Sequence, residues 1–150
     1  MCVETRHKLR LYKKEKLCSV TAIDALFAVR HKGETATEGA AIAYPLRMVW
    51  RVNTARSVPA GIQFLISVPK KKLRHAVDRV TMRRRIREAY RLNRHLIPLP
   101  EHVAALDTAF VYVADRIVDS AHVHAAMTKL LHKAAEAIAP ATTADNGNEA

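Results

Sequence analysis

Residues 66–93 read ISVPKKKLRHAVDRVTMRRRIREAYRLN and contain the strongest structural pattern of the chain. This stretch opens with the end of an apolar, β-prone segment (residues 61–68) that Pro69 stops. From Asp78 to about Ile97, apolar or small residues recur at spacings of four and three, so they form one stripe along a helix. We therefore expect a strand followed by a helix whose buried face consists of Met82, Ile86, Ala89, Asn93 and Leu96.

The opposite side of this helix is almost entirely arginine. At 100° per residue, five side chains cover an arc of about 100°: Arg83, Arg84, Arg87, Arg91 and Arg94. Like charges one turn apart cost roughly a few tenths of a kcal/mol per pair, and only Asp78 and Glu88 are close enough along the chain to offset them. This face therefore predicts a polyanionic ligand whose phosphates remove the repulsion. The alternative is a solvated charged surface.

The whole chain has the composition of one basic globular domain. It has 150 residues, of which 49% are hydrophobic, and a net charge of +11. Residues 70–95 hold eleven basic and two acidic residues, whereas residues 96–150 are net acidic, so the charge is not a general solubility feature. Cys2 and Cys18 give neither a disulfide framework nor a zinc quartet, which favours a reducing compartment. Without an apolar run of membrane-spanning length or a signal core in residues 1–16, we expect a cytoplasmic protein.

Helix and strand patterns alternate along the rest of the chain. We expect further helices over residues 21–31 and 120–139, and strands over residues 41–52, 61–68 and 108–114. The expected fold class is α+β, a mixed α/β sandwich with helices packed on a central sheet. We expect a single domain over residues 1–139, in which residues 1–16 form a basic extended arm, followed by a disordered tail over residues 140–150.

No set of residues predicts a protein active site or a metal centre. The eight histidines are scattered, and those on the last expected helix, His122, His124 and His132, are not four residues apart. The sequence offers no Ser/His/Asp or Cys/His set and no Gly-rich phosphate loop. We therefore expect neither catalytic nor metal-binding residues in the protein.

Three runs of residues resemble the protein subunit of bacterial ribonuclease P. They are residues 66–71, 76–79 and 83–93, which are similar to the family's Ser-Val-Ser-Lys-Lys strand end and to its Arg-Asn-Arg helix running into Arg-Glu-Ala-Tyr/Phe-Arg. Residues 11–17, 24–27 and 110–114 are similar to family segments on either side. The chain departs from the pattern at Arg79-Val80-Thr81, which stands for Arg-Asn-Arg, and at Pro69, which stands for the second serine.

The resemblance implies a fold and two RNA-binding surfaces. The fold is a roughly four-stranded sheet with helices in the order αβββαβα and a left-handed β-α-β crossover, against the usual right-handed rule. The surface implied for the catalytic RNA consists of Lys70, Lys71, Lys72, Arg74, Arg79, Arg83, Arg84, Arg87, Arg91 and Arg94. A cleft between the first helix and the sheet is implied for the single-stranded 5′ leader of precursor tRNA, lined by Ile23, Phe27, Phe110 and Tyr112, with Tyr44 or Trp50 as additions. Ordinary core packing is the alternative for Ile23, Phe27 and Phe110.

The implied function is that of an accessory subunit. In the family the RNA cleaves the leader endonucleolytically with bound Mg²⁺, and the protein helps to bind precursor tRNA. The rival class is a basic ribosomal or ribosome-assembly protein that binds RNA without a role in cleavage. A DNA-binding module is disfavoured because the basic helix lacks a preceding helix and turn and offers only Asn93 for reading bases. A membrane-surface helix is disfavoured because the face opposite the arginines is needed for the core, so we expect neither DNA nor membrane partners.

Overall fold

The computed structural model describes residues 11, 13–27, 38–53, 61–97 and 105–138. Its elements follow the order η1 (Lys13–Glu15), α2 (Val20–Phe27), β1 (Glu38–Ala43), β2 (Leu46–Val52), β3 (Gly61–Ser67), α3 (Ala76–Asn93), η2 (Arg94–Leu96), β4 (Ala105–Tyr112) and α4 (Ser120–Ile138). This order confirms the α+β class and the expected αβββαβα sequence. Most of the expected N-terminal arm, the end of the helix expected over 21–31, and the tail over 140–150 lie outside the described residues.

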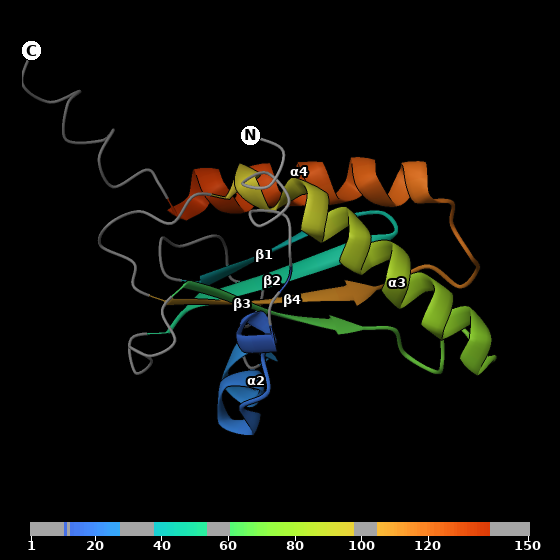
Figure 1. The fold of residues 1–150 in the computed structure, drawn as a ribbon, viewed down its shortest axis with the longest axis horizontal. Coiled ribbons are helices and arrows are strands. Elements are labelled where there is room, and N and C mark those ends of the chain that lie inside the picture. The colour runs from blue at the N-terminus through green and yellow to red at the C-terminus, as the bar shows by residue number, and fades with distance from the viewer. Residues whose placement is uncertain (1–10, 12, 28–37, 54–60, 98–104, 139–150) are drawn as a thin grey trace, which may run out of the picture.

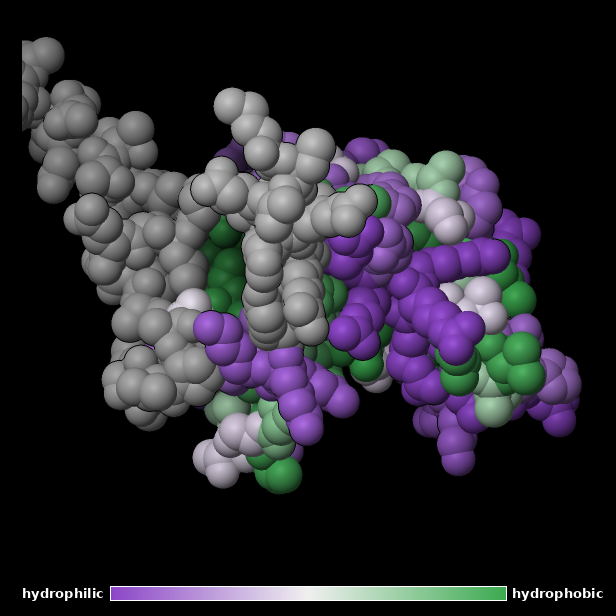
Figure 2. All heavy atoms as spheres, in the orientation of Figure 1, coloured by the Kyte–Doolittle hydropathy of each residue, from purple (hydrophilic) through white to green (hydrophobic). Residues whose placement is uncertain are grey.

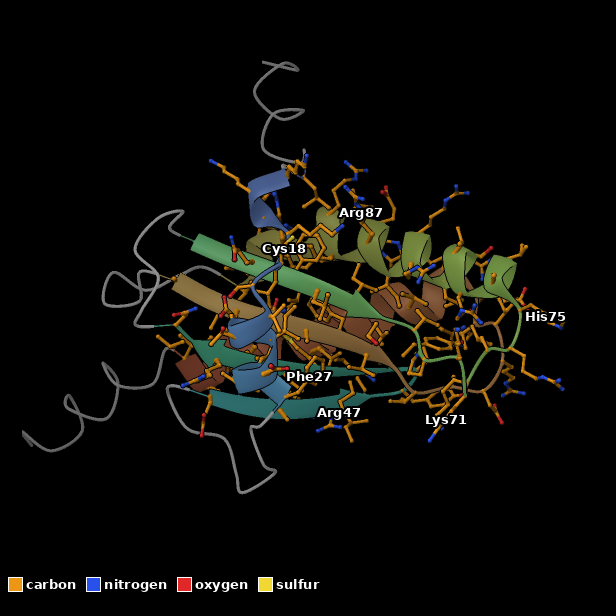
Figure 3. All side chains as sticks on the ribbon, turned by 90° about the horizontal axis from the view of Figure 1, so that it is seen from below. Cys18, Phe27, Arg47, Lys71, His75 and Arg87 are labelled. Carbon is orange, nitrogen blue, oxygen red and sulfur yellow. The ribbon has the colours of Figure 1, made fainter. Side chains whose placement is uncertain are left out.

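The four strands form one mixed sheet in the order β1-β2-β4-β3 (Figure 1). Strand β2 runs antiparallel to both β1 and β4, whereas β3 and β4 are parallel. Parallel neighbours cannot be joined by a tight turn, so the chain returns from β3 to β4 through α3. In Figure 3 the sheet is seen from the α2 side, and α3 lies on the far face. When the figure is turned so that the arrows of β3 and β4 point upward, β4 lies to the right of β3. The crossover is therefore left-handed, as the resemblance implies.

The main core fills the space between the sheet and helices α3 and α4. The expected α3 stripe is confirmed at Met82, Ile86 and Ala89, which are fully buried. Tyr90, which the stripe did not include, is also buried, and its ring centroid lies 4.4 Å from that of Phe64. Helix α4 contributes buried side chains that include Val123, Met127, Leu130, Ala134 and Ile138.

The strand expected over residues 41–52 is in fact a hairpin. Strands β1 and β2 are joined by a tight turn at Tyr44-Pro45, and Ala43 pairs with Leu46. The error arose because the apolar run continues through the turn, although Pro45 lacks the N–H that a central strand needs. Two boundaries also differ: β4 begins at Ala105 rather than at 108, and α3 ends at Asn93 before a short 3₁₀ turn.

A close contact between β1 and β2 generates a prediction about stability. Gly39 pairs with Trp50, and a Cβ on Gly39 would lie 2.5 Å from the indole Cζ2 atom. Because Trp50 is fully buried, we expect Gly39→Ala to destabilise the protein by about 1–3 kcal/mol, measured by urea unfolding. The control Ile42→Ala alters a side chain of the same strand that is 61% exposed, and should change stability by about 0.5 kcal/mol or less. Equal effects would show that the indole moves aside freely.

Candidate nucleic-acid interface

Helix α3 holds three arginines on its solvent side because its other side is committed to the core. Met82 and Ile86 pack under the helix, so Arg83, Arg84 and Arg87 are exposed. None of the three makes an ion pair or side-chain hydrogen bond with any residue that the structure describes. Figure 2 shows hydrophilic side chains gathered over α3 in the right half of the view, and Figure 3 shows Arg87 projecting from the helix. This face is therefore a concentration of positive charge without internal neutralisation.

The other arginines of the helix have partners inside the protein. Arg91 donates two hydrogen bonds to Glu88, at 2.9 and 2.5 Å, and this contact lowers the pKa of the Glu88 carboxyl group. Arg94 pairs with Glu15 at 2.5 Å, and both side chains are largely buried. The Arg85 guanidinium donates to the carbonyl of Val118 at 2.6 Å. The predicted contact residues Arg91 and Arg94 are therefore both paired inside the protein, and Arg94 also links the N-terminal segment to the end of α3.

Arg79 holds the basic turn that precedes the helix. Its Nη1 atom donates to the carbonyls of Leu73 and Arg74, both at 2.9 Å. Leu73 is buried and anchors the end of this turn. Arg79 therefore acts as a positioning residue, and it sets where the exposed side chains of the turn lie relative to α3: Lys70, Lys71, Lys72 and Arg74.

Among the described residues, α2 covers part of the second face of the sheet. Ala40, Val49, Ala109 and Leu65 form one row across the four strands, and Leu26 packs on this row. Ile23 packs at the edge of the same cluster and is half-buried. This arrangement agrees with the alternative of core packing for Ile23.

Beside α2, the described residues leave this face of the sheet open. The next row across the strands consists of Ile42, Arg47, Val111 and Ser67. Phe27, at the end of α2, is 47% exposed, and it lies on the same side of the sheet as Arg47 (Figure 3). Sequence reasoning did not assign Ile42, Arg47 or Val111 to a site, although a charged residue inside an apolar strand is the signal that marks Arg47.

Phe110 and Tyr112 do not lie on this face, and their expected place in the cleft is wrong. They pair with Met48 and Leu46, so all four side chains point toward α3 and α4. Both aromatic side chains are fully buried, and the Tyr112 hydroxyl donates to the carbonyl of Arg116. Trp50 lies in the same core, whereas Tyr44 is 59% exposed in the hairpin turn. Strand β4 is buried on both faces, so its sequence shows no alternation that would reveal which way each side chain points.

The described part of the chain lacks both a cluster of metal ligands and a membrane-spanning helix. It contains no group of three His, Cys, Asp or Glu residues that could hold a metal ion. The nearest arrangement is a pair, in which Asp119 contacts the His122 ring at the start of α4. None of the described helices has the length and apolar character to cross a bilayer.

Comparison with known proteins places the chain in a family. The model of the family described as Ribonuclease P matches residues 11–135. Two curated relatives, from two strains of Porphyromonas gingivalis, carry the name ribonuclease P protein component; they are 39% and 38% identical over 124 residues, which is 81% of this chain and 83% of each relative. A solved structure of the RNase P protein from Thermotoga maritima, in complex with 1-(4-fluorophenyl)-2-thiourea, matches with a TM-score of 0.46 and 21% identity, over 64% of this chain and 85% of that one.

The family match covers the helix with the arginine face, the basic turn before it and all four strands. The identity to the curated relatives extends over most of both chains, so the similarity is not confined to one motif. The chain therefore belongs to the ribonuclease P protein family, whose members are RNA-binding accessory subunits of a ribonucleoprotein endoribonuclease.

Proposed function

We propose that this protein binds the catalytic RNA of ribonuclease P through α3 and binds the 5′ leader of precursor tRNA on the α2 side of its sheet. The observation that carries the proposal is the exposed face of Arg83, Arg84 and Arg87, which has no neutralising partner among the described residues. Each guanidinium presents donors in a planar fork that matches phosphate oxygens. RNA phosphates would supply the missing counter-charges and would release the cations condensed on the RNA.

The α2 side suits a single strand better than a duplex. Its open row combines apolar side chains with Arg47, and Phe27 stands exposed beside it. Unpaired bases can stack on an aromatic ring whatever their identity, while a nearby cation contacts the backbone. A leader that lacks a pairing partner offers these features, whereas the body of mature tRNA is folded.

We assign the Mg²⁺ of the reaction to the RNA rather than to this chain. Magnesium prefers oxygen ligands in octahedral geometry, and RNA phosphates provide them. The described residues do not fit such a site, because no cluster of carboxylates occurs among them. The free thiol of Cys18 is exposed, which agrees with a reducing compartment, and we place the protein in the cytoplasm with its RNA partners.

Reconstitution tests this function directly. The full chain would be mixed with ribonuclease P RNA from the same organism and a precursor tRNA at low magnesium, and release of the 5′ leader would be followed. Leader release that requires both the protein and the RNA is the expected result; RNA-only and protein-only reactions serve as controls. Tight RNA binding without any stimulation of cleavage would instead favour a ribosomal or assembly role.

Charge reversal on α3 should weaken binding to the catalytic RNA. Replacing Arg83 and Arg87 together by Glu removes two phosphate contacts, so we expect the Kd to rise about tenfold or more and the slope of log K against log salt to flatten by about 2. The matched control reverses Lys129 and Lys133, two exposed residues with the same spacing on α4, and should leave both quantities nearly unchanged. Filter binding over a series of salt concentrations measures both the Kd and the salt slope. Equal losses would show that only net charge matters.

Shortening Phe27 should affect the leader selectively. In the reconstituted holoenzyme we expect Phe27→Ala to weaken binding of leader-bearing precursor by about fivefold or more, with little change for mature tRNA, because a stacking surface is lost. The control Val20→Ala removes an apolar side chain from the same helix that is 71% exposed. Equal losses for precursor and mature tRNA would contradict a leader contact, provided that circular dichroism shows an intact fold.

A further inference from the structure

A groove of about 850 Å³ runs along the edge of the sheet at β3, apart from the open row beside α2. One wall is α3 and the other is the N-terminal segment, residues 13–17. The volume lies in the range of pockets that hold small ligands, so it accommodates a nucleotide. We call this feature the edge groove.

The N-terminal wall is fixed in place before any ligand binds. The N–H of Leu17 donates to the carbonyl of Phe64 at 2.9 Å, and the Gln63 side-chain amide donates to the carbonyl of Lys14 at 2.8 Å. The ion pair between Glu15 and Arg94 ties the same segment to the end of α3. The groove is therefore preorganised, so a ligand would not have to order this wall.

Both walls of the edge groove are positively charged. Lys13 and Lys16 lie on the N-terminal wall, and Arg83, Arg84 and Arg87 lie on the α3 wall. None of these five has an ion-pair partner among residues 11, 13–27, 38–53, 61–97 and 105–138. Figure 3 shows Arg87 on the side of α3 that faces η1. Two facing rows of unneutralised cations select a ligand that places negative charge along both rims.

The floor between these rims is apolar. It consists of Leu11, Phe64, Ile66 and Val80, with Leu65 at the side. Val80 is 37% exposed, so it presents a methyl surface to the groove in the position where the family pattern has Asn. An apolar floor would not strengthen the binding of a phosphate group. It would strengthen the binding of a nucleobase, because the flat face of the base is removed from water when it packs on apolar side chains.

We propose that the edge groove receives an unpaired nucleotide of the RNA bound by α3, with its base on the apolar floor and the flanking phosphates on the two basic rims. The inference rests on the proposed RNA binding by α3 and adds a preference for single-stranded RNA. A base inside a duplex cannot reach the floor, because both its faces are stacked and its edge is paired. The ligand class is therefore an unstacked nucleotide in a loop, bulge or junction.

Two valines on α3 allow a test with matched charge. Val80 lines the groove, whereas Val77, one turn earlier, is 76% exposed and is not part of its lining. Val80→Glu and Val77→Glu add the same charge to the same helix. Binding of the full-length variants to a fluorescent ten-nucleotide oligouridine, and to an RNA hairpin of equal charge, would be measured by anisotropy.

We expect Val80→Glu to weaken oligouridine binding by about fivefold more than Val77→Glu does, while the two variants lose the same affinity for the hairpin. Equal losses for oligouridine would overturn the edge groove as a base-binding site. The Arg83/Arg87 reversal keeps this outcome separate from failure of the proposed function: if α3 binds RNA, that variant loses affinity for both probes. A benzoylphenylalanine placed at position 80 should also crosslink to an unpaired nucleotide of the catalytic RNA, and crosslinks only within helical regions would contradict the proposal.

Discussion

The parallel pairing of β3 with β4 determines where the helices of this fold must lie. It obliges the chain to cross back over the sheet between them, and α3 is the element that does so. The crossing buries Met82 and Ile86, so the other side of the helix must face solvent. Strand β3 is also the edge strand of the sheet, and Lys16 of the N-terminal segment pairs with it at Phe64. The arginine face and the edge groove are thus two consequences of one connection.

Stability and RNA binding make opposite demands on α3. Hydrogen bonds or ion pairs inside the protein occupy Arg79, Arg85, Arg91 and Arg94. Except for Glu88, which pairs with Arg91 within the helix, these partners lie outside α3. The three remaining arginines receive no such compensation within the described residues, so the core must supply the free energy that their repulsion removes. A bound polyanion reverses this balance, because a ligand that binds only the folded state stabilises it. The unneutralised face is therefore best understood as half of an interface.

Periodicity predicted the parts of the fold in which one face of an element is apolar and the other polar. The spacing of Met82, Ile86 and Ala89 therefore located the buried side of α3 correctly. Periodicity failed at the Tyr44-Pro45 turn, because apolar residues continue on both sides of it. It also failed on β4, because a strand that is buried on both faces shows no alternation from which the orientation of Phe110 could be predicted. Pairs distant in sequence, such as Glu15 with Arg94, have no local signal, so the sequence could not show which arginines are neutralised.

The N-terminal segment separates the two surfaces assigned to RNA. Lys16 lines the edge groove, while the next residue, Leu17, is buried beneath α2 on the other side of the β3 edge. Successive side chains of an extended backbone point to opposite sides, so this short stretch contributes a cation to one surface and a core contact to the other. Leu65 links the same two regions from within the sheet, because it packs near α2 and also borders the groove. An RNA strand on the α2 side and an unpaired nucleotide held by α3 would therefore lie on opposite sides of the N-terminal segment and the β3 edge. The substrate and the catalytic RNA would then be neighbours on the protein without sharing a binding surface.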